Sequence, residues 1–289
     1  MVAAPDPLED PAVERVIAVA IEEDLGRGDV TSEAIVPAGR RGRATVQAKS
    51  ALVVAGLPLI ARVYQRLGPV AVAVRSAEGA AVPAGTVLAE VEGDARVLLA
   101  GERTVLNLLQ HLSGIATLTR RCVEDLAGGA CVIRDTRKTL PGLRVLEKYA
   151  VRIGGGTNHR MRLDDGVLIK DNHVALVGGV GAAVAAAKRA LPAHEIEVEC
   201  DTLAEVDEAL EAGADVILFD NMAPGEMARA VRLVGGRARM EASGGVTPER
   251  IREIAGLKVD YIAMGCLTHS APAVDVSMAI APADGGPAR

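Results

Sequence analysis

The chain has 289 residues, of which 49% are hydrophobic and 1% aromatic, and it carries a formal net charge of −6. A chain of this length holds one large domain or two smaller ones, with a core built from aliphatic side chains. The acidic balance and the scarcity of aromatic rings disfavour nucleic-acid binding, which requires a basic face and stacking rings. No apolar run reaches the roughly 18 to 20 residues that a membrane span needs, so we expect no membrane partner.

The N-terminal residues and the cysteines predict a cytoplasmic protein. No basic segment followed by an apolar stretch opens the sequence, so no signal peptide is expected. The four cysteines are scattered without a CxxC pair, which favours reduced thiols over a disulfide or zinc framework. They are Cys122, Cys131, Cys200 and Cys266.

Three helices are predicted in the first 125 residues. Apolar positions at helical spacing cover 8–25, 57–67 and 96–125, and the last pattern is interrupted at Gly114. Residues 26–37 have the composition of a loop.

Strands are predicted between these helices. Alternating apolar residues cover 43–56 and 70–77. Residues 78–93 predict two short strands joined by a turn at 83–85. That pattern is similar to the hairpins of lipoyl and biotin carrier domains, but no lysine stands at the turn to be modified.

After Gly129, short apolar runs alternate with helical patterns. The runs are too uniformly apolar to face water, so they favour a parallel sheet covered by helices. The expected strands are CVIRD, VLIKD, IEVEC, VILFD, ARMEAS and YIAMG. The expected helices are a Gly/Ala-rich one that ends at Leu191, and others over 202–212, 224–234 and 248–256.

Five positions at the ends of these strands point to one site. They are Lys170, Glu199, Asp220, Ser243 and Gly265. The last four are 21 to 23 residues apart, which corresponds to one strand and one helix each. In an α/β barrel the carboxyl ends of the strands surround a single mouth, so these residues are expected to converge. An open doubly wound sheet would also place its site there, and the pattern favours the barrel without excluding that alternative.

Basic residues are concentrated between Arg134 and Lys170. The segment has nine Arg or Lys and four acids, a local balance of +5 in an acidic chain. A solvated basic face would have the same balance, but the glycines, threonines and apolar runs among these charges are more typical of a pocket for a polyanion. The residues that could hold several anionic groups are Arg137, Lys138, His159, Arg160 and Lys170.

Two carboxylates and two glycine-containing turns would complete such a pocket. Glu199 and Asp220 could bind Mg²⁺ or ribose hydroxyls, with a plain ion-pair network as the alternative. The turns at 243–245 and 264–266 bring backbone N–H groups close together, which suits a phosphate. Their residues are Ser243, Gly244, Gly245, Met264, Gly265 and Cys266. His173 could be structural or functional, and Cys200 is expected to point away from Glu199, to the other face of its strand.

At these residues the sequence resembles the quinolinate phosphoribosyltransferase family, and the resemblance covers nearly the whole chain. It is carried by EEDLGRGDVTS (22–32), AGERTVLNLLQHLSGIAT (100–117), RDTRKTLPGLRVLEKYAVRIGGGTNHR (134–160), LIKDNHV (168–174), EVE (197–199), LFDNM (218–222), EASGGV (241–246) and DYIAMGCLTHS (260–270). Departures from the family pattern are small: Met222, Met264 and Cys266.

The resemblance implies an α/β fold with two domains. An N-terminal α/β sandwich domain would cover 1–115, with the C-terminal tail 271–289 returning to it, and an incomplete (β/α) barrel would cover 116–270. It also implies an obligate homodimer, and allows a further assembly into a hexamer. The N-terminal domain of one protomer would cover the barrel mouth of its partner, with Arg103 reaching across.

The resemblance further implies the substrates, quinolinate and phosphoribosyl pyrophosphate, and the cofactor Mg²⁺. Quinolinate would meet Arg103, Thr136, Arg137, Lys138, His159, Arg160 and Lys170. Glu199 and Asp220 would hold the ribose hydroxyls and Mg²⁺, and 243–245 with 264–266 would receive the 5′-phosphate. The residues expected to carry catalysis are Lys138, Lys170, Glu199 and Asp220.

The expected reaction gives nicotinate mononucleotide, pyrophosphate and CO₂, a step of NAD biosynthesis. Two other enzyme readings are open: a sister transferase linked to molybdenum transport, which the intact DTRKT and KDNHV segments disfavour, and an aldolase that forms a Schiff base at Lys170. A non-catalytic sugar-phosphate sensor would leave the paired carboxylates without a purpose.

Overall fold

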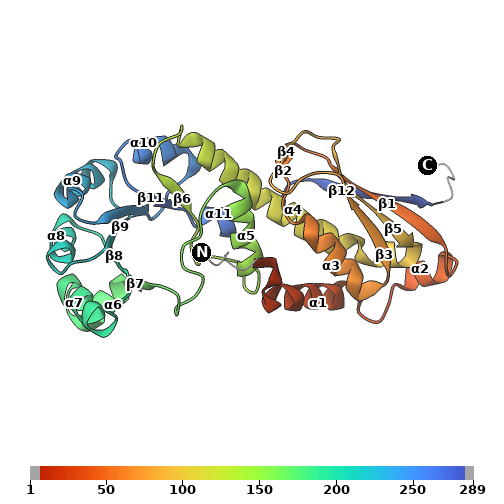
Figure 1. Ribbon diagram of the computed structural model, residues 1–289, viewed down its shortest axis with the longest axis horizontal. Helices are drawn as coiled ribbons and strands as arrows, with labels where there is room; N and C mark the ends of the chain where they lie inside the picture. The colour runs from red at the N-terminus through yellow and green to blue at the C-terminus, as the bar shows by residue number, and fades with distance from the viewer. Residues whose placement is uncertain (1–6, 284–289) are drawn as a thin grey trace. The chain divides into compact units, whose positions relative to one another are not determined.

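The computed structural model describes residues 7–283, which form two compact units (Figure 1). The sandwich unit comprises residues 7–120, 140–155 and 270–283, and the barrel unit comprises residues 121–139 and 156–269. A division of the chain near residue 116 would leave 140–155 in the barrel, whereas in the structure this segment groups with the sandwich unit.

An antiparallel sheet with the strand order β12-β1-β5-β3 is the framework of the sandwich unit. Its strands are β1 (Arg41–Ala48), β3 (Val70–Val74), β5 (Val87–Asp94) and β12 (Val276–Pro282). Every second residue of β1 is buried, as expected for a sheet with one face on a core. The strand β12 pairs with β1 along its whole length, so a C-terminal segment completes a sheet built from the N-terminal part of the chain.

Three helices of the sandwich unit agree closely with the sequence pattern: α1 (Pro11–Leu25), α3 (Leu57–Leu67) and α4 (Ala95–Asp125). Tyr64 of α3 is fully buried and donates its hydroxyl to the carbonyl of Leu98 in α4 at 3.1 Å. A Cβ at Gly101 would lie 2.4 Å from the Tyr64 ring, so only glycine allows the two helices to approach this closely.

The helix α4 is continuous through Gly114, where a break was predicted. A Cβ at this position would lie 2.2 Å from the carbonyl oxygen of Pro272. The glycine is therefore explained by a close approach of the C-terminal segment, and it does not end the helix.

Residues 26–37, predicted as a loop, contain the short helix α2 (Val30–Ile35). Asp29 caps this helix, because its carboxylate accepts the backbone N–H groups of Thr31 and Ser32 at 3.1 and 3.0 Å. The cap compensates for β-branched residues that are poor helix formers.

The two strands predicted in 78–93 do not pair with each other. The strand β4 (Ala81–Val82) pairs with β2 (Leu52–Val53), whereas β5 lies between β1 and β3. The prediction of two short strands on either side of 83–85 is confirmed, and the likeness to a carrier-domain hairpin is not, because each strand pairs with another partner. The sandwich unit also contains α5 (Arg144–Gly154), a helix that the sequence analysis missed.

The barrel unit has a six-stranded parallel sheet with the order β6-β11-β10-β9-β8-β7. Its strands are β6 (Val132–Arg134), β7 (Val167–Ile169), β8 (Ile196–Cys200), β9 (Val216–Asp220), β10 (Arg239–Ser243) and β11 (Tyr261–Ala263). Its first strand in the chain, β6, pairs with the last, β11. The strands from β7 to β11 follow one another in a single direction without the reversal that defines a doubly wound sheet, so that alternative is wrong. Within residues 7–283 no pairing joins β6 to β7, and the barrel is incomplete.

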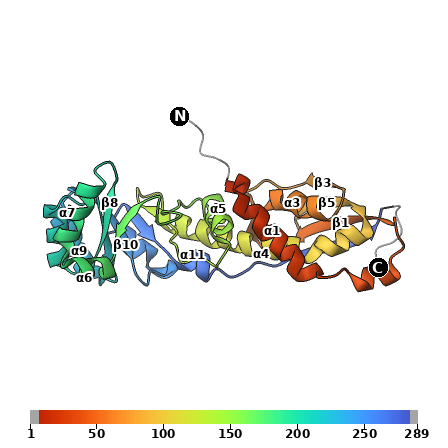
Figure 2. The same cartoon turned by 90° about the horizontal axis from the view of Figure 1, so that it is seen from below.

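Helices follow the strands and lie outside the curved sheet (Figures 1 and 2). They are α6 (Asp171–Val177), α7 (Val180–Ala190), α8 (Leu203–Glu211), α9 (Pro224–Val234), η2 (Pro248–Arg250), α10 (Ile251–Ala255) and α11 (Cys266–His269). In β8 and β9 the apolar residues are buried, while Glu199 and Asp220 at the carboxyl ends are partly exposed. None of the helices described is long and apolar enough to cross a membrane.

Candidate active site

A cavity of about 420 Å³ opens at the carboxyl ends of the barrel strands. Basic and hydroxyl side chains line it, from Thr136, Arg137, Lys138, His159, Arg160, Lys170 and Ser243. Four acids also contribute, Asp171, Glu199, Asp220 and Glu241, and the apolar lining comes from Leu168, Leu218 and Ala263. The structure therefore brings together the basic segment and the strand-end carboxylates that the sequence placed in one mouth.

The guanidinium groups of Arg137 and Arg160 both line this cavity, close enough for the charge of one to affect the other. Burial lowers the pKa of Arg160, and the nearby positive charge of Arg137 lowers it further. Nη1 of Arg160 donates to the carbonyl of Gly166 at 2.9 Å, which fixes the side chain. Nε of Arg137 is buried and forms no hydrogen bond within residues 7–283. Two like charges held this way favour an anionic ligand between them.

Lys170 and Glu199 form an ion pair between the ends of the neighbouring strands β7 and β8. The side chain of Lys170 is 42% exposed and lies against a carboxylate, so its surroundings are polar and partly open to water. This environment disfavours the aldolase alternative, because a Schiff-base lysine needs apolar surroundings that suppress its charge. His173 is structural: its Nδ1 accepts the N–H of Lys170 at 2.9 Å at the start of α6.

Asp220 lies at the end of β9 beside Glu199, and its Oδ2 accepts the side-chain amide of Asn221 at 2.8 Å. The two carboxylates supply hard oxygen ligands of the kind that Mg²⁺ or ribose hydroxyls require. Cys200, next to Glu199, is fully buried, and burial raises the pKa of its thiol to about 12. It is therefore inert, as predicted from strand alternation.

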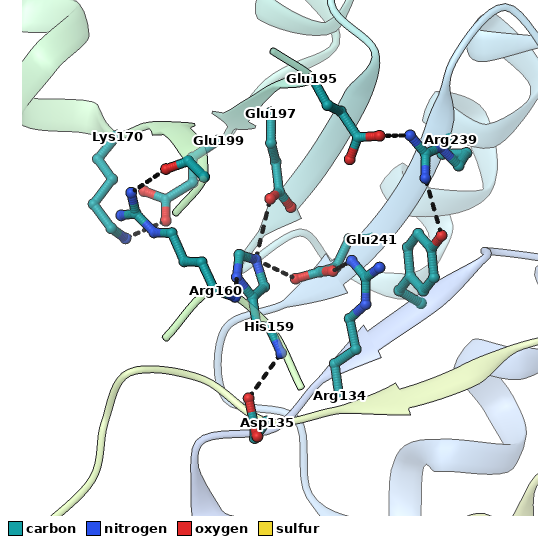
Figure 3. A network of polar contacts seen from close by, with 12 residues as sticks. Arg134, Asp135, His159, Arg160, Lys170, Glu195, Glu197, Glu199, Arg239 and Glu241 are labelled. Carbon is teal, nitrogen blue, oxygen red and sulfur yellow. Dashed lines mark hydrogen bonds and ion pairs between the residues drawn. The ribbon is translucent and has the colours of Figure 1, made fainter. Parts of the chain in front are cut away.

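A buried polar cluster lies below the exposed part of the cavity (Figure 3). Nε2 of His159 is 3.1 Å from Oε2 of Glu197 and 3.6 Å from Oε1 of Glu241. Nη1 of Arg134 lies 2.9 Å from Oε2 of Glu241, and its guanidinium carbon is 3.3 Å from the centre of the Tyr261 ring. The cluster joins strands β6, β8, β10 and β11 under the cavity.

The pKa values of Glu241 and His159 are both raised within this cluster. Burial, and then the charge of Glu197, raise the pKa of Glu241 to about 7. Burial lowers the pKa of His159, but Glu197 and Glu241 raise it by more, so it lies above the ordinary value. Both shifts therefore arise from the close approach of His159, Glu197 and Glu241 within this buried cluster.

Asp135 fixes the loop that carries His159. It is fully buried after β6, and its two carboxylate oxygens accept the backbone N–H of His159 at 2.9 Å and the side-chain amide of Asn158 at 2.5 Å. Arg160 follows directly, so the end of β6 positions two residues of the cavity.

The two glycine-containing turns lie beside the cavity. Ser243 lines it, and Gly244 has a φ of +79°, where a Cβ would come within 2.3 Å of Asn221 Oδ1. A Cβ on Gly265 would be 3.0 Å from Cδ of Lys138, and the Lys138 carbonyl accepts the hydroxyl of Thr268 at 2.7 Å. The lining does not include Gly244, Gly245, Met264, Gly265 or Cys266, so their phosphate role stays a prediction.

Arg103 is another predicted site residue that does not line the cavity. It is exposed on α4, in the sandwich unit, and no side-chain hydrogen bond or ion pair joins it to residues 7–283. Other members of the basic segment also lie elsewhere, since Arg144, Lys148 and Arg152 belong to α5.

The sequence analysis missed Arg134, Asp135, Glu197 and Glu241. A signal was present for two of them, because Glu197 and Glu241 interrupt strands that are otherwise apolar and buried. A buried acid in the middle of a parallel strand requires a positive partner or a proton. The identity of that partner could not be predicted, because Arg134 lies more than 100 residues from Glu241 in the chain.

An incomplete parallel barrel with cations and carboxylates around its mouth defines an α/β-barrel enzyme for small polyanionic substrates. The family follows from comparison with known proteins. The N- and C-terminal domains of quinolinate phosphoribosyl transferase match residues 29–113 and 115–279. The chain belongs to the quinolinate phosphoribosyl transferase family.

Individual relatives match the chain over most of its length. It is 46% identical to the probable carboxylating nicotinate-nucleotide pyrophosphorylase of Bacillus subtilis, with 89% of each chain covered. It is 44% identical to the carboxylating nicotinate-nucleotide pyrophosphorylase of Mycobacterium leprae, covering 90% of this chain and 94% of the relative. The crystal structure of NadC from Streptococcus pyogenes superimposes with a TM-score of 0.91 at 39% identity, over 98% of this chain and all of the other.

Proposed function

We propose that this protein transfers the phosphoribosyl group of phosphoribosyl pyrophosphate to quinolinate, with loss of CO₂. The products are nicotinate mononucleotide, pyrophosphate and CO₂, and the reaction is a step of NAD biosynthesis. The observation that carries the proposal is the cavity itself, which is lined by Arg137, Arg160, Glu199 and Asp220 in a chain of this family. The cations suit a dicarboxylate, and the two acids suit the hydroxyls of a sugar.

Quinolinate has two adjacent carboxylates on a pyridine ring. Arg137 and Arg160 can each form paired hydrogen bonds with a carboxylate, and Lys170 supplies a movable point charge. Thr136 supports this wall, because its hydroxyl oxygen accepts the N–H of Lys138 at 3.0 Å and so fixes the turn between them. Lys138, exposed and near Gly265, is placed to neutralise the pyrophosphate.

Glu199 and Asp220 are the residues proposed to hold the ribose hydroxyls and Mg²⁺. Their donor set fits the ion, since both are carboxylates at neighbouring strand ends and both line the cavity. When bound with the substrate, Mg²⁺ would neutralise charge on the departing pyrophosphate. The turns at 243–245 and 264–266 are proposed to bind the 5′-phosphate through backbone N–H groups.

In the proposed reaction the bond from ribose C1 to pyrophosphate breaks as the pyridine nitrogen bonds to C1. Positive charge develops on the ribose, so the carboxylates of Glu199 and Asp220 stabilise the transition state. The resulting pyridinium ring accepts the electron pair released when the adjacent carboxylate leaves as CO₂, and that ring carbon then takes up a proton. Holding two anionic substrates in contact accounts for most of the rate enhancement.

The proposal includes an assembly. A homodimer would place Arg103 of one protomer at the cavity of its partner, which agrees with its exposed position and with its lack of ion pairs to the described residues. Further assembly into a hexamer and a cytoplasmic location belong to the same proposal.

Incubation of the protein with Mg²⁺, phosphoribosyl pyrophosphate and quinolinate tests this function. We expect nicotinate mononucleotide as the product, and no turnover when nicotinate replaces quinolinate, because nicotinate lacks the second carboxylate. Turnover of nicotinate without turnover of quinolinate would contradict the proposal.

A further inference from the structure

The ring of His159 contacts protein atoms through both of its nitrogens. Nδ1 accepts the backbone N–H of Arg160 at 2.7 Å. Nε2 faces the carboxylates of Glu197 and Glu241 at 3.1 and 3.6 Å. The side chain is 9% exposed, and Figure 3 shows its ring between the chain of Arg160 on one side and the two acids, Glu197 and Glu241. Its polar atoms are thus directed at the protein and away from a ligand in the cavity.

The hydrogen bond at Nδ1 fixes the position of the ring proton. A nitrogen that accepts an N–H group carries no proton, so the ring proton of neutral His159 is on Nε2, facing Glu197. The ligand atoms of His159, Glu197 and Glu241 lie within 4.8 Å of one another, a spacing that would also suit a metal ion. A metal bound to Nε2 would require the ring proton to be on Nδ1. That nitrogen already accepts the backbone N–H of Arg160, so it cannot also carry a proton. The geometry therefore favours a proton over a metal in this cluster.

The cluster is anchored from several strands. Glu197 comes from β8 and Glu241 from β10, while Arg134 from β6 holds the second oxygen of Glu241 at 2.9 Å. Tyr261 of β11 stacks on Arg134, and Arg239 reaches the hydroxyl of Tyr261 at 3.2 Å. One oxygen of Glu197 and one of Glu241 are buried without a hydrogen bond among the described residues, which is costly unless the acids are held there for a purpose.

We propose that His159, Glu197 and Glu241 are positioning residues that act through Arg160. The two buried acids, from strands β8 and β10, hold Nε2 of the His159 ring. Nδ1 of the same ring holds the backbone N–H of Arg160. The two strands therefore determine where the guanidinium of Arg160 lies relative to Arg137. The inference rests on the proposed function for the identity of the ligand, an aromatic ring with two adjacent carboxylates. It assigns to His159 a role in holding Arg160, where the sequence analysis expected direct contact with quinolinate.

This arrangement has a consequence for specificity. Two guanidinium groups at a fixed separation favour a ligand whose two carboxylates have the matching separation, and each good paired contact adds to the discrimination. If the ring is released from the acids, the backbone of Arg160 can shift and change the position of its guanidinium, even though Nη1 also donates to the carbonyl of Gly166 at 2.9 Å. The preference for a dicarboxylate over a monocarboxylate should then fall. Binding of phosphoribosyl pyrophosphate, held by other residues, should change little.

A double-mutant cycle on the full-length protein tests whether Glu241 acts through Arg160. The dissociation constant of quinolinate is measured by calorimetry for the wild type, Glu241→Ala, Arg160→Ala and the double variant. We expect Glu241→Ala to weaken binding at least tenfold, and to have less than a twofold effect once Arg160 is already alanine. Equal, additive losses in both backgrounds would overturn the proposal.

Two matched variants keep the test valid if Glu241→Ala folds poorly. Glu241→Gln preserves the volume and an oxygen for Arg134, and we expect its quinolinate affinity to stay within about threefold of the wild type. His159→Asn keeps an acceptor near Nδ1 but loses the contact with the acids, whereas His159→Gln keeps a donor near Nε2 but loses the acceptor. Both His159 variants should weaken quinolinate binding when Arg160 is present. Neither should weaken it further once Arg160 is alanine. Additive losses for both histidine variants in that background would overturn the role assigned to Arg160.

A measurement without substrate separates this inference from the proposed function. Nitrogen-15 spectra of the histidine rings at pH 8.5, with the His159 signal assigned from its absence in His159→Asn, should show a neutral ring with the proton on Nε2. A ring protonated on Nδ1, or a divalent metal that copurifies stoichiometrically and is lost in Glu241→Gln, would overturn the inference. Failure of the wild type to bind quinolinate would count against the proposed function, and the ring spectra would still decide the role of His159.

Discussion

Lys170 and Glu199 form an ion pair between the carboxyl ends of two neighbouring parallel strands. Both side chains line the cavity. Under the proposed function, Lys170 would turn to the dicarboxylate when both substrates bind, and Glu199 would then be released to hold the ribose hydroxyls.

Removing either Lys170 or Arg137, two of the cations proposed to bind the dicarboxylate, should abolish turnover and leave the fold intact. Lys170→Ala and Arg137→Ala are each expected to reduce kcat/KM for quinolinate by at least a thousandfold, because an anionic substrate then lacks a charged partner. Both side chains are partly exposed, so the melting temperature should change by only a few degrees. Activity near the wild-type level in either variant would contradict the site assignment.

Arg103 should act in the active site of the partner protomer. Arg103→Ala and Lys170→Ala are each expected to be inactive alone, and mixing them under conditions of subunit exchange should restore part of the activity. The reason is that a mixed dimer contains one site with both residues intact. A lack of activity after exchange, with mixed dimers demonstrated by mass spectrometry, would count against the arginine acting across the interface.

Gly114→Ala should destabilise the sandwich unit, although alanine is the better helix former. The added Cβ would lie 2.2 Å from the Pro272 carbonyl, so either α4 or the C-terminal segment must move. We expect a loss of about 1–3 kcal/mol in the free energy of unfolding, as for other overpacked positions. Gly225→Ala in α9 is the matched control, because nothing lies within 4 Å of its added Cβ. It should be neutral or stabilise by up to about 1 kcal/mol; equal effects at the two positions would argue against the close approach.

Glu241→Gln should change how stability depends on pH. Burial raises the pKa of Glu241 to about 7. Below its ordinary pKa of 4.5 the folded and unfolded chains both hold the proton, so the raised pKa has no effect on stability. Between that value and about 7 only the unfolded chain releases the proton, and the wild type loses up to about 1.4 kcal/mol per pH unit from this group.

The Glu241→Gln variant has no carboxyl proton to release at this position. Its free energy of unfolding, measured by urea denaturation relative to the wild type, should therefore rise with pH up to about 7 and then level off. Glu249→Gln provides a control, because a hydrogen bond from the Thr247 side chain lowers the pKa of Glu249. Its difference from the wild type should change only below about pH 4.5 and stay constant between pH 4.5 and 7. A difference between Glu241→Gln and the wild type that stays constant from pH 4.5 to 7 would show that Glu241 ionises at an ordinary pH.

Much of the barrel unit could be predicted from the sequence. Its strands are continuous apolar runs bounded by polar ends, and the regular spacing of Glu199, Asp220 and Ser243 places them at one edge of the sheet. That regularity is local in the chain, so it is visible without knowledge of tertiary contacts. The site residues from Thr136 to Lys170 were found because their charges stand out in an acidic sequence.

The missed features depend on contacts between distant segments. Gly114 resembles a helix break until Pro272 is seen beside it, and β4 resembles half of a hairpin until β2 is seen to pair with it. Glu241 is an acid in an apolar strand whose meaning depends on Arg134, more than 100 residues away. Sequence periodicity carries no information about such pairings.

The central claim is that one cavity joins phosphoribosyl transfer to decarboxylation of quinolinate. The most direct test supplies quinolinate labelled with carbon-14 in the carboxylate next to the ring nitrogen, together with Mg²⁺ and phosphoribosyl pyrophosphate. Labelled CO₂, pyrophosphate and nicotinate mononucleotide should appear in equal amounts, with no CO₂ when phosphoribosyl pyrophosphate is omitted. Release of CO₂ without the sugar donor, or formation of a nucleotide that retains the label, would contradict the claim.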